Sequence, residues 1–325
     1  MVGRPQDLAG VPLLVTGGAG FIGSHLVEAL VGQGAQVRVL DNLSSGRRAN
    51  LDAVLGDVEL VVADIRDPVA CRNACSGAQL VFHQAALGSV PRSMADPATT
   101  IAVNVTGTAN VFAAARDAGA RRVVYASSSS VYGDSQKLPK REGEEGRPLS
   151  PYALSKVMNE QLAEVYGRCF DMELIGLRYF NVYGPRQDPQ GPYAAVIPRF
   201  FAACLAGRAP VIFGDGEQSR DFTFVADVVE ANLAAATAPS AAEGRAYNVA
   251  AGAPTTVNQL ARLVAEVAGV AVEPVHEPPR AGDVLHSAAD PELARESLGF
   301  SAHTPLADGL RAAAGYYRRI AQEPR

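Results

Sequence analysis

Short apolar runs alternate with amphipathic stretches over the first 180 residues of the chain. The runs predict buried strands at residues 11–15, 36–40, 58–63, 79–83, 122–126 and 173–177. Apolar residues that recur every three or four positions predict a helix ending near residue 30 and further helices over residues 69–75, 100–118 and 151–169. Strands that are apolar throughout and alternate with helices are typical of a parallel sheet covered on both faces. We therefore expect an α/β fold with a doubly wound parallel sheet.

The pattern changes after Phe180. Glycine and proline become frequent between residues 184 and 198, and the apolar segments become shorter and less regular. This change predicts a domain boundary near residue 180. We expect a sheet domain over residues 1–180 and a smaller α/β lobe over residues 181–325, with the chain crossing between them more than once.

Composition narrows the class of protein. The 325 residues carry 29 Lys and Arg against 34 Asp and Glu, a formal net charge of −5, which argues against nucleic acid or an anionic membrane as the main partner. Four cysteines are too few for a disulfide framework, and the five scattered histidines complete no set of metal ligands. The first ten residues lack the apolar core of a signal peptide, and no run approaches the ~20 apolar residues of a membrane span. We expect a cytoplasmic protein without a metal centre.

Three glycines, Gly17, Gly20 and Gly23, lie between the first predicted strand and the first predicted helix. Glycines at this spacing allow a tight turn, let backbone amides approach a pyrophosphate and let the helix pack close to the sheet. The pyrophosphate then lies at the helix N-terminus, where free N–H groups favour an anion. Asp41 ends the second predicted strand, where a carboxylate accepts from a ribose 2′-hydroxyl. The pattern predicts a dinucleotide site that prefers NAD, although Arg47 and Arg48 are near enough in sequence to meet the 2′-phosphate of NADP.

A tyrosine and a lysine, Tyr152 and Lys156, stand four residues apart and therefore on one face of a predicted helix. An ammonium near a phenol stabilises the phenolate, so we expect Lys156 to lower the pKa of Tyr152 and make it an acid or base for a hydroxyl or carbonyl. Ser127 to Ser130 end a strand at the edge where open parallel sheets bind ligands, so one hydroxyl there can share the same reacting oxygen. Alone, the tyrosine–lysine spacing is more typical of a solvated helix face, and at least two of the four serines are expected to have only the role of a loop or a helix cap.

Together these segments resemble the extended short-chain dehydrogenase/reductase family, in its NAD-dependent nucleotide-sugar epimerase branch. Within that branch they are most similar to the UDP-hexose 4-epimerases, and closest to the UDP-N-acetylglucosamine 4-epimerase group. The resemblance extends from Val15 to about Tyr317. It rests on an ordered set of motifs: TGGAGFIGSHL (16–26), DNLSSG (41–46), HQAA (83–86), NVTGT (104–108), SSSVYG (128–133), PYALSK (151–156), LRYFNVYGPRQ (177–187) and RAGDVLHSAAD (280–290).

The resemblance implies a Rossmann-type sheet, a tightly bound and recycled NAD, and a UDP-sugar that is inverted at C4 through a transient 4-keto intermediate. It implies that Tyr152 deprotonates the C4 hydroxyl, that Lys156 holds the nicotinamide ribose, and that Ser128 shares the hydrogen bond of the reacting oxygen. The residues expected around NAD are Gly17, Gly20, Phe21, Ile22, Asp41, Asn42, Ser45, Gly46, Asp64, Ile65, Gln84, Ala85, Ala86, Asn104, Ala126, Tyr152, Lys156 and Tyr179. Those expected around the UDP-sugar are Gly88, Ser89, Ser128, Ser129, Tyr152, Asn181, Ala195, Val196, Val211, Phe213, Arg220, Arg280, Asp283 and Ser287.

The resemblance also bears on the reaction. Dehydratases of this branch carry an Asp-Glu pair where this chain has Ser129 and Ser130, and uronate decarboxylases carry a glutamate between the tyrosine and the lysine, where this chain has Ala-Leu-Ser. Both reactions are therefore disfavoured, and epimerisation at C4 remains. Two other classes stay open: a net dehydrogenase that consumes free NAD, and a dinucleotide-binding protein without catalysis.

The sugar is indicated by a few positions. Ser287 stands where family members limited to glucose and galactose carry a bulky residue, so the pocket has room for an N-acetyl group. We expect UDP-N-acetylglucosamine and UDP-N-acetylgalactosamine as substrates, with UDP-glucose and UDP-galactose as additional ones. UDP-glucuronate is the alternative, although Asp188 would repel its carboxylate unless Arg186 or Arg92 binds it. Family members pair helices like those over residues 100–118 and 152–167 in a four-helix bundle, so we expect a homodimer.

Overall fold

The computed structural model describes residues 8–190, 194–239, 244–279 and 285–322. Its centre is a seven-stranded sheet in the order β11-β6-β5-β4-β1-β2-β3, and every neighbouring pair is parallel. The strands are β1 (Pro12–Thr16), β2 (Gln36–Asp41), β3 (Val58–Val62), β4 (Leu80–His83), β5 (Arg122–Ser128), β6 (Glu173–Tyr179) and β11 (Arg245–Val249). The expected doubly wound parallel sheet is confirmed, and the six predicted strands agree with the observed ones to within two residues.

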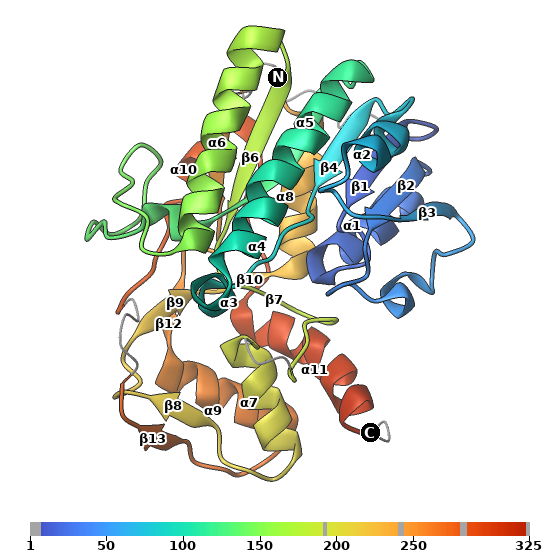
Figure 1. Ribbon diagram of the computed structural model, residues 1–325. Helices are drawn as coiled ribbons and strands as arrows, with labels where there is room; N and C mark the ends of the chain where they lie inside the picture. Colours follow the sequence, from blue (N-terminus) through green and yellow to red (C-terminus); the bar gives the residue numbers. More distant parts are fainter. Residues whose placement is uncertain (1–7, 191–193, 240–243, 280–284, 323–325) are drawn as a thin grey trace.

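Helices cover both faces of the sheet (Figure 1). One face carries α1 (Phe21–Gly32) and α8 (Val225–Thr237), and the other carries α2 (Pro68–Cys75), α5 (Gly107–Asp117) and α6 (Pro151–Phe170). Successive residues of β1 serve opposite cores: Leu13 and Val15 pack with α1, whereas Leu14 packs with α5 and α2. This double burial is why the strand is apolar at successive positions rather than alternating with polar residues.

The helix predicted over residues 100–118 is divided. It consists of α4 (Pro97–Ile101), a π-helical turn η2 (Ala102–Thr106) and α5, and it follows the short helix α3 (Val90–Ala95). Asp96 begins α4 by accepting a hydrogen bond from the backbone N–H of Thr99. A π-helical turn inserts one extra residue and turns the helix face that follows it. Asn104 lies on this turn and is completely buried.

A second lobe lies beside the carboxyl ends of the strands, at the bottom of Figure 1. Its core is formed by α7 (Val196–Leu205), α9 (Val257–Ala268) and α11 (Leu306–Gln322). Three strand pairs border it: β7 (Val182–Tyr183) with β10 (Thr223–Phe224), β8 (Val211–Phe213) with β13 (Val275–Glu277), and β9 (Ser219–Asp221) with β12 (Pro254–Thr256). The remaining short elements are η1 (Arg48–Leu51), η3 (Ser129–Tyr132) and α10 (Glu292–Leu298).

The chain returns from this lobe to the sheet. Helix α8 packs on the same face as α1, β11 pairs with β6, and α10 contacts both β11 and α8. Residues 225–237, 245–249 and 292–298 therefore belong with the sheet although they lie beyond residue 180.

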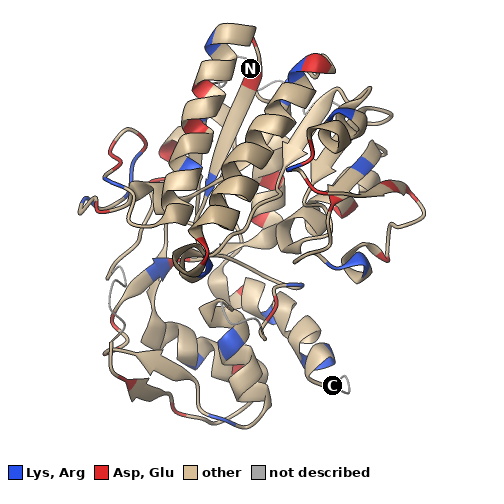
Figure 2. Cartoon of the chain, in the orientation of Figure 1, with Lys and Arg blue, Asp and Glu red and all other residues tan. Residues whose placement is uncertain are grey.

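None of the helices described is long and apolar enough to cross a membrane. Charged residues of both signs are interspersed over the face shown in Figure 2.

Candidate active site

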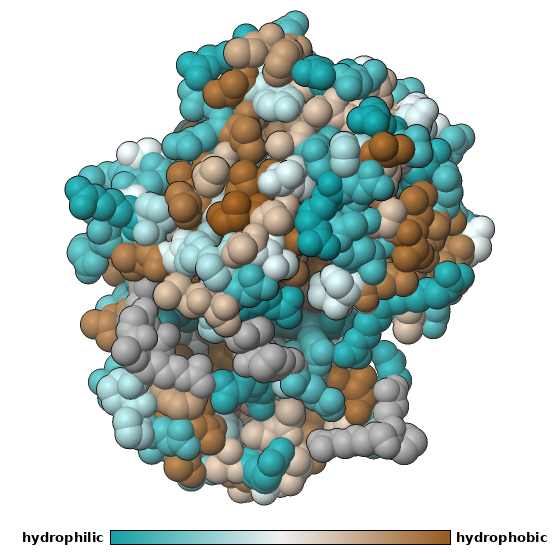
Figure 3. Space-filling view, viewed as in Figure 1, coloured by the Kyte–Doolittle hydropathy of each residue, from teal (hydrophilic) through white to brown (hydrophobic). Residues whose placement is uncertain are grey.

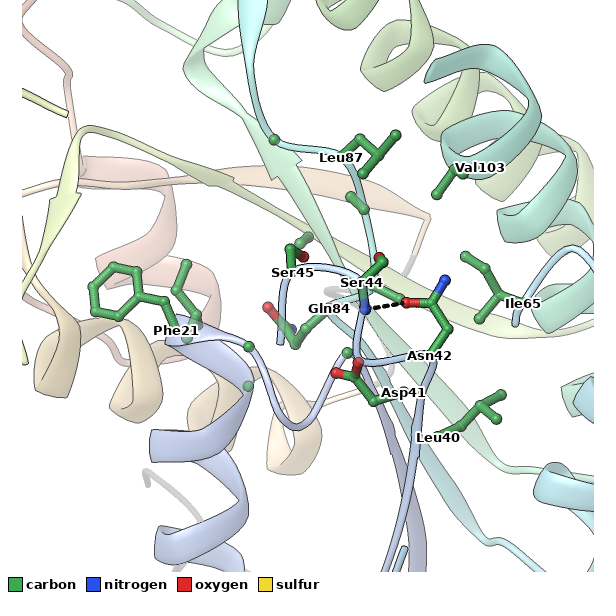
Figure 4. A pocket seen from close by; sticks show the side chains of 18 of the residues that line it. Phe21, Leu40, Asp41, Asn42, Ser44, Ser45, Ile65, Gln84, Leu87 and Val103 are labelled. Atoms are coloured by element: carbon green, nitrogen blue, oxygen red, sulfur yellow. Dashed lines mark hydrogen bonds between the residues drawn. The ribbon is translucent and has the colours of Figure 1, made fainter. Parts of the chain in front are cut away.

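A cavity opens at the carboxyl ends of β1, β2, β4, β5 and β6. In an open parallel sheet this edge is the usual place for a ligand. Sixteen of the eighteen residues predicted to bind NAD line this cavity: Gly17, Gly20, Phe21, Ile22, Asp41, Asn42, Ser45, Asp64, Ile65, Gln84, Ala85, Ala86, Ala126, Tyr152, Lys156 and Tyr179. Figure 4 shows the side of the cavity formed by Asp41, Asn42, Ser44 and Gln84.

The turn between β1 and α1 is built for close backbone approach. Gly17 has φ +67°, and a Cβ there would lie 2.6 Å from the backbone nitrogen of Ala85. A Cβ on Gly23 would lie 2.1 Å from the carbonyl oxygen of Gly17. Helix α1 begins after Gly20 with no side-chain cap and no acidic residue in its first turn. Its free N–H groups therefore fit a pyrophosphate.

The carboxylate of Asp41 lies at the end of β2 and is buried. Its Oδ2 accepts from the backbone N–H of Ala19 at 2.9 Å, and its Oδ1 accepts from that of Leu43 at 2.8 Å. Gly46 does not line the cavity, but a Cβ there would lie 2.9 Å from each carboxylate oxygen of Asp41. Each oxygen keeps a second lone pair for a ribose hydroxyl. The residues present therefore fit the adenosine side of NAD.

Asn104 departs from its predicted role as a cavity residue. Its Oδ1 accepts from the backbone N–H of Leu87 at 2.8 Å, and its Nδ2 donates to Ser155 Oγ at 3.0 Å. Leu87 lines the cavity, whereas Asn104 is buried behind it. Asn104 thus joins α6 to the loop after β4 instead of facing the dinucleotide.

Tyr152 and Lys156 both face the cavity from α6. The helix begins at Ser150, whose hydroxyl accepts from the backbone N–H of Ala153, and proline occupies the first turn. The Ser128 hydroxyl lies near enough to the Tyr152 phenol to lower its pKa. The Lys156 Nζ donates to the carbonyl oxygen of Ala126 at 2.8 Å. The three predicted catalytic residues are therefore brought together.

The protonation of this group differs from the sequence-based expectation. Desolvation raises the pKa of Tyr152, and only the nearby Ser128 hydroxyl acts in the opposite direction. The expected lowering of this pKa by Lys156 is therefore wrong for the protein chain alone. Burial lowers the pKa of Lys156 to about 8, while the negative charge of Glu160 raises it. Both groups are enclosed, so desolvation disfavours the charged form of each.

The predicted substrate residues fall into separate places. Gly88 and Tyr152 line the cavity. Ser128 and Ser129 begin η3, where Ser128 Oγ accepts from the backbone N–H of Ser130, and Ser89 caps α3 by accepting from Arg92 N. The others among the described residues lie in or beside the second lobe and outside this cavity: Asn181, Ala195, Val196, Val211, Phe213, Arg220 and Ser287. Arg280 and Asp283 lie outside the described residues.

Strand β9 brings together two of the residues predicted to bind the UDP-sugar. The backbone N–H of Ser287 donates to the carbonyl oxygen of Ser219 at 3.0 Å. Arg220 follows Ser219 and donates to the carbonyl oxygen of Leu285 at 3.3 Å. The segment that carries Ser287 therefore runs beside the strand that carries Arg220. That these residues bind one ligand stays a prediction.

The sequence analysis did not name several residues that line the cavity. Leu40 and Ala63 precede Asp41 and Asp64 at the strand ends, so the rule that selected those aspartates could have found them. Leu87 and Val103 carry no comparable signal, because they reach the cavity from a loop and from η2. The complete set is Gly23, Leu40, Ser44, Ala63, Leu87, Val103 and Ser127.

One group of side chains outside the cavity has ligand atoms near enough for a metal ion. The ligand atoms of Asp227, Glu230 and His303 lie within 4.8 Å of one another. The Asp227 carboxylate already accepts from Thr304 Oγ1 at 2.9 Å and from the backbone N–H of Thr304 at 3.3 Å. These bonds fix the loop that precedes α11, so the carboxylate has a structural role there.

The comparisons with known proteins agree with this architecture. Residues 13–250 match the NAD dependent epimerase/dehydratase family. A UDP-glucose 4-epimerase of Mycolicibacterium smegmatis is 42% identical over 313 residues, which cover 95% of this chain and 99% of the relative. The structure of a Thermotoga maritima UDP-glucose 4-epimerase with UDP-glucose has a TM-score of 0.91 and 38% identity, with 96% and 100% of the two chains covered.

A second solved structure is as similar in fold. The UDP-N-acetylglucosamine 4-epimerase of Methanobrevibacter ruminantium, in complex with UDP-N-acetylmuramic acid, has a TM-score of 0.92 and 36% identity, with 97% and 100% of the chains covered. The glycine turn, the strand-end aspartate and the tyrosine–lysine pair all lie within the matched residues. This chain belongs to the NAD dependent epimerase/dehydratase family, and its cofactor is NAD.

Proposed function

We propose that this chain is a UDP-sugar 4-epimerase whose acid–base residue is Tyr152. The observation that carries the proposal is the position of Tyr152, which faces the dinucleotide cavity from α6 and lies near the Ser128 hydroxyl. A phenol placed there can take the proton of a sugar hydroxyl and return it. Relatives named UDP-glucose 4-epimerase and UDP-N-acetylglucosamine 4-epimerase support the same reaction class.

Tyr152, Ser128 and Lys156 each have a separate role in the proposed reaction. NAD, when bound, supplies reversible oxidation at the sugar carbon. Tyr152 holds and moves the proton at the C4 oxygen, and Ser128 shares the hydrogen bond to that oxygen. Lys156, nearly fully buried, supplies a positive charge at the same place. Ser128 to Ser130 offer no carboxylate for the elimination of water, which supports epimerisation over dehydration.

We propose UDP-N-acetylglucosamine and its galacto epimer as the principal substrates, with UDP-glucose and UDP-galactose accepted as well. The small Ser287 supports this, because it leaves room at its position beside Arg220. The contacts of Arg186 argue against a uronate. Arg186 pairs with Glu28 and also donates to Ser24 Oγ at 3.2 Å. The guanidinium of Arg186 is therefore committed to α1 rather than offered to a substrate carboxylate.

The test is product analysis by anion-exchange chromatography. Purified protein without added NAD is incubated separately with UDP-N-acetylglucosamine, UDP-glucose and UDP-glucuronate. We expect galacto-configured products from the first two sugars, no product from Tyr152→Phe, and an unchanged rate from Tyr166→Phe, a control in the same helix. Product from UDP-glucuronate alone would overturn the choice of sugar and make Arg92 the next residue to vary. No product from any sugar, or full activity in Tyr152→Phe, would overturn the proposed function.

We further propose that the chain forms a homodimer through α5 and α6. Leu154, Val165 and Phe170 of α6 are 42%, 42% and 45% exposed. Figure 3 shows apolar residues gathered on the face over α5 and α6. Large apolar side chains that remain exposed along a helix are typical of a surface that packs against a partner.

A further inference from the structure

A buried ion pair joins β6 to α6, the helix that carries Tyr152 and Lys156. Arg178 of β6 donates from Nε to Glu160 Oε1 at 2.9 Å and from Nη2 to Oε2 at 2.8 Å, so the pair is bidentate. The side chains are 7% and 16% exposed. Nη1 of Arg178 also pairs with Glu145 and donates to the hydroxyl of Tyr132 at 3.0 Å. An arginine held at all these points fixes the Glu160 carboxylate in one place.

Glu160 reaches the cavity through Ser127. The Ser127 hydroxyl donates to Glu160 Oε1 at 2.5 Å. Ser127 lines the cavity and immediately precedes Ser128, whose hydroxyl lowers the pKa of Tyr152. The carboxyl end of β5 is therefore tied to Glu160 at the residue next to the reacting group.

Glu160 also follows the catalytic pair along α6. Tyr152, Lys156 and Glu160 are each four residues apart, so they stand on one side of the helix in consecutive turns. Lys156 is 3% exposed, and an enclosed ammonium needs a nearby negative charge. Glu160, one turn further along α6, supplies one, and its charge raises the pKa of Lys156.

We propose that Glu160 is a positioning residue of this active site: it is held by Arg178, fixes the end of β5 through Ser127, and supplies the counter-charge for Lys156. This inference rests on the proposed function, because it concerns how Tyr152 and Lys156 are kept ready. Glu160 does not line the cavity. It acts through Ser127 and Lys156, which do.

The other titratable groups near Lys156 leave this role to Glu160. His83 of β4 is buried, and its pKa is lowered to about 3, so it is neutral. Burial raises the pKa of Tyr125 of β5 well above its usual value, so it is neutral too. Tyr179 of β6 donates its hydroxyl to Gln84 Oε1 at 3.0 Å. Among the described residues that affect the charge of Lys156, Glu160 is the negative one.

The first experiment compares Glu160→Gln with Glu164→Gln. Glu164 lies one turn further along α6, is 59% exposed and pairs with Arg168 at the surface, so it is a matched control. The readouts are the pH profile of kcat, KM, and NAD bound per chain. For Glu160→Gln we expect kcat to fall about tenfold with KM and NAD content unchanged. The alkaline limb of the profile should move down by about one pH unit, because Lys156 then loses its proton more easily. Glu164→Gln should match the wild type.

Removal of Glu160 alone leaves Arg178 partly unpaired and can destabilise the fold. The double variant Glu160→Gln/Arg178→Met removes both charges and keeps the proposal testable. We expect this variant to recover thermal stability while its alkaline limb stays shifted. A wild-type alkaline limb in the double variant, or an unchanged profile in Glu160→Gln, would overturn the role of Glu160. Ser127→Ala should lower kcat without moving the alkaline limb, because it removes the link to β5 and keeps the charge. Wild-type protein that turns over no UDP-sugar would instead overturn the proposed function.

Discussion

Arg47 and Asp188 form an ion pair, with Nη2 2.8 Å from Oδ2, that joins the loop after β2 to the second lobe. The sequence alone left open whether Arg47 meets the 2′-phosphate of NADP. In the structure its guanidinium is held by a carboxylate instead. Arg47 is therefore already paired, and the Asp41 carboxylate lies at the end of β2, where it lines the cavity.

We predict that Asp41→Ala and Asp188→Ala both weaken the preference for NAD over NADP, by different amounts. Asp41 is buried beside the ribose position, so its loss should shift the ratio of the two dissociation constants tenfold or more. The Arg47–Asp188 pair is exposed, and such pairs contribute about 0–1 kcal/mol, so Asp188→Ala should shift the ratio less than about fivefold. Titration of NAD-depleted protein with each dinucleotide gives the ratios. An equal shift in the two variants would contradict this order.

The predicted site residues that the structure brings to one cavity come from local patterns. The glycine turn, Asp41 and the Tyr152–Lys156 spacing each depend on a single strand–turn–helix or one helix face, which short-range patterns determine. Six of the seven parallel strands of the sheet follow from the same alternation. The sequence analysis expected the chain to cross between the two domains more than once, but it did not identify β11 as a strand of the sheet. The five residues of β11 carry no periodicity that distinguishes a strand of the sheet from a strand of the second lobe.

What the sequence could not predict depends on contacts between distant segments. The sequence analysis placed Asn104 around NAD. In the structure its side-chain amide is hydrogen-bonded to Leu87 and Ser155 instead of lining the cavity. The pKa of Tyr152 depends on how completely surrounding elements exclude water, which spacing does not encode. Arg186 looked available to a substrate until its pairing with Glu28 on α1 was seen, across 158 positions of sequence.

Gly17 provides a test of the pyrophosphate turn. Both Gly17 and Gly119 have positive φ, +67° and +69°, but only a Cβ on Gly17 would meet backbone within 4 Å. Gly119→Ala should therefore cost about 1–2 kcal/mol of unfolding free energy for the backbone conformation alone. Gly17→Ala should cost more and should also lower NAD content, because the loop that carries Ala85 must move. Equal stability and equal NAD content in the two variants would show that the close approach is unimportant.

His83 should make the fold acid-sensitive. It is buried, with Nδ1 2.6 Å from Thr16 Oγ1 and Nε2 2.9 Å from Thr108 Oγ1, and burial lowers its pKa to about 3. Its unfolded pKa is about 6.5. Between these values the unfolded chain binds a proton that the folded chain does not, so the free energy of unfolding falls as pH falls from about 6.5 toward 3. The loss approaches about 1.4 kcal/mol per pH unit.

Urea unfolding at several pH values in this window measures the effect. His83→Gln keeps groups that can bond both threonines but does not titrate, so its stability should fall less steeply with acid than that of the wild type. His276→Gln, at an exposed position, should keep the wild-type slope. A wild-type slope in His83→Gln would assign the acid sensitivity to other groups.

The proposed dimer gives the last prediction. Leu154 and Val165 lie on α6 and are each 42% exposed, whereas Val62 on the edge strand β3 is 56% exposed and lies away from that helix. A glutamate buried in an apolar interface is strongly unfavourable, so Leu154→Glu/Val165→Glu should separate the subunits. Light scattering should give about twice the 33.9 kDa chain mass for the wild type and for Val62→Glu, and a single chain mass for the double variant. A wild-type monomer at micromolar concentration would contradict the dimer. A double variant that stays dimeric would place the interface elsewhere.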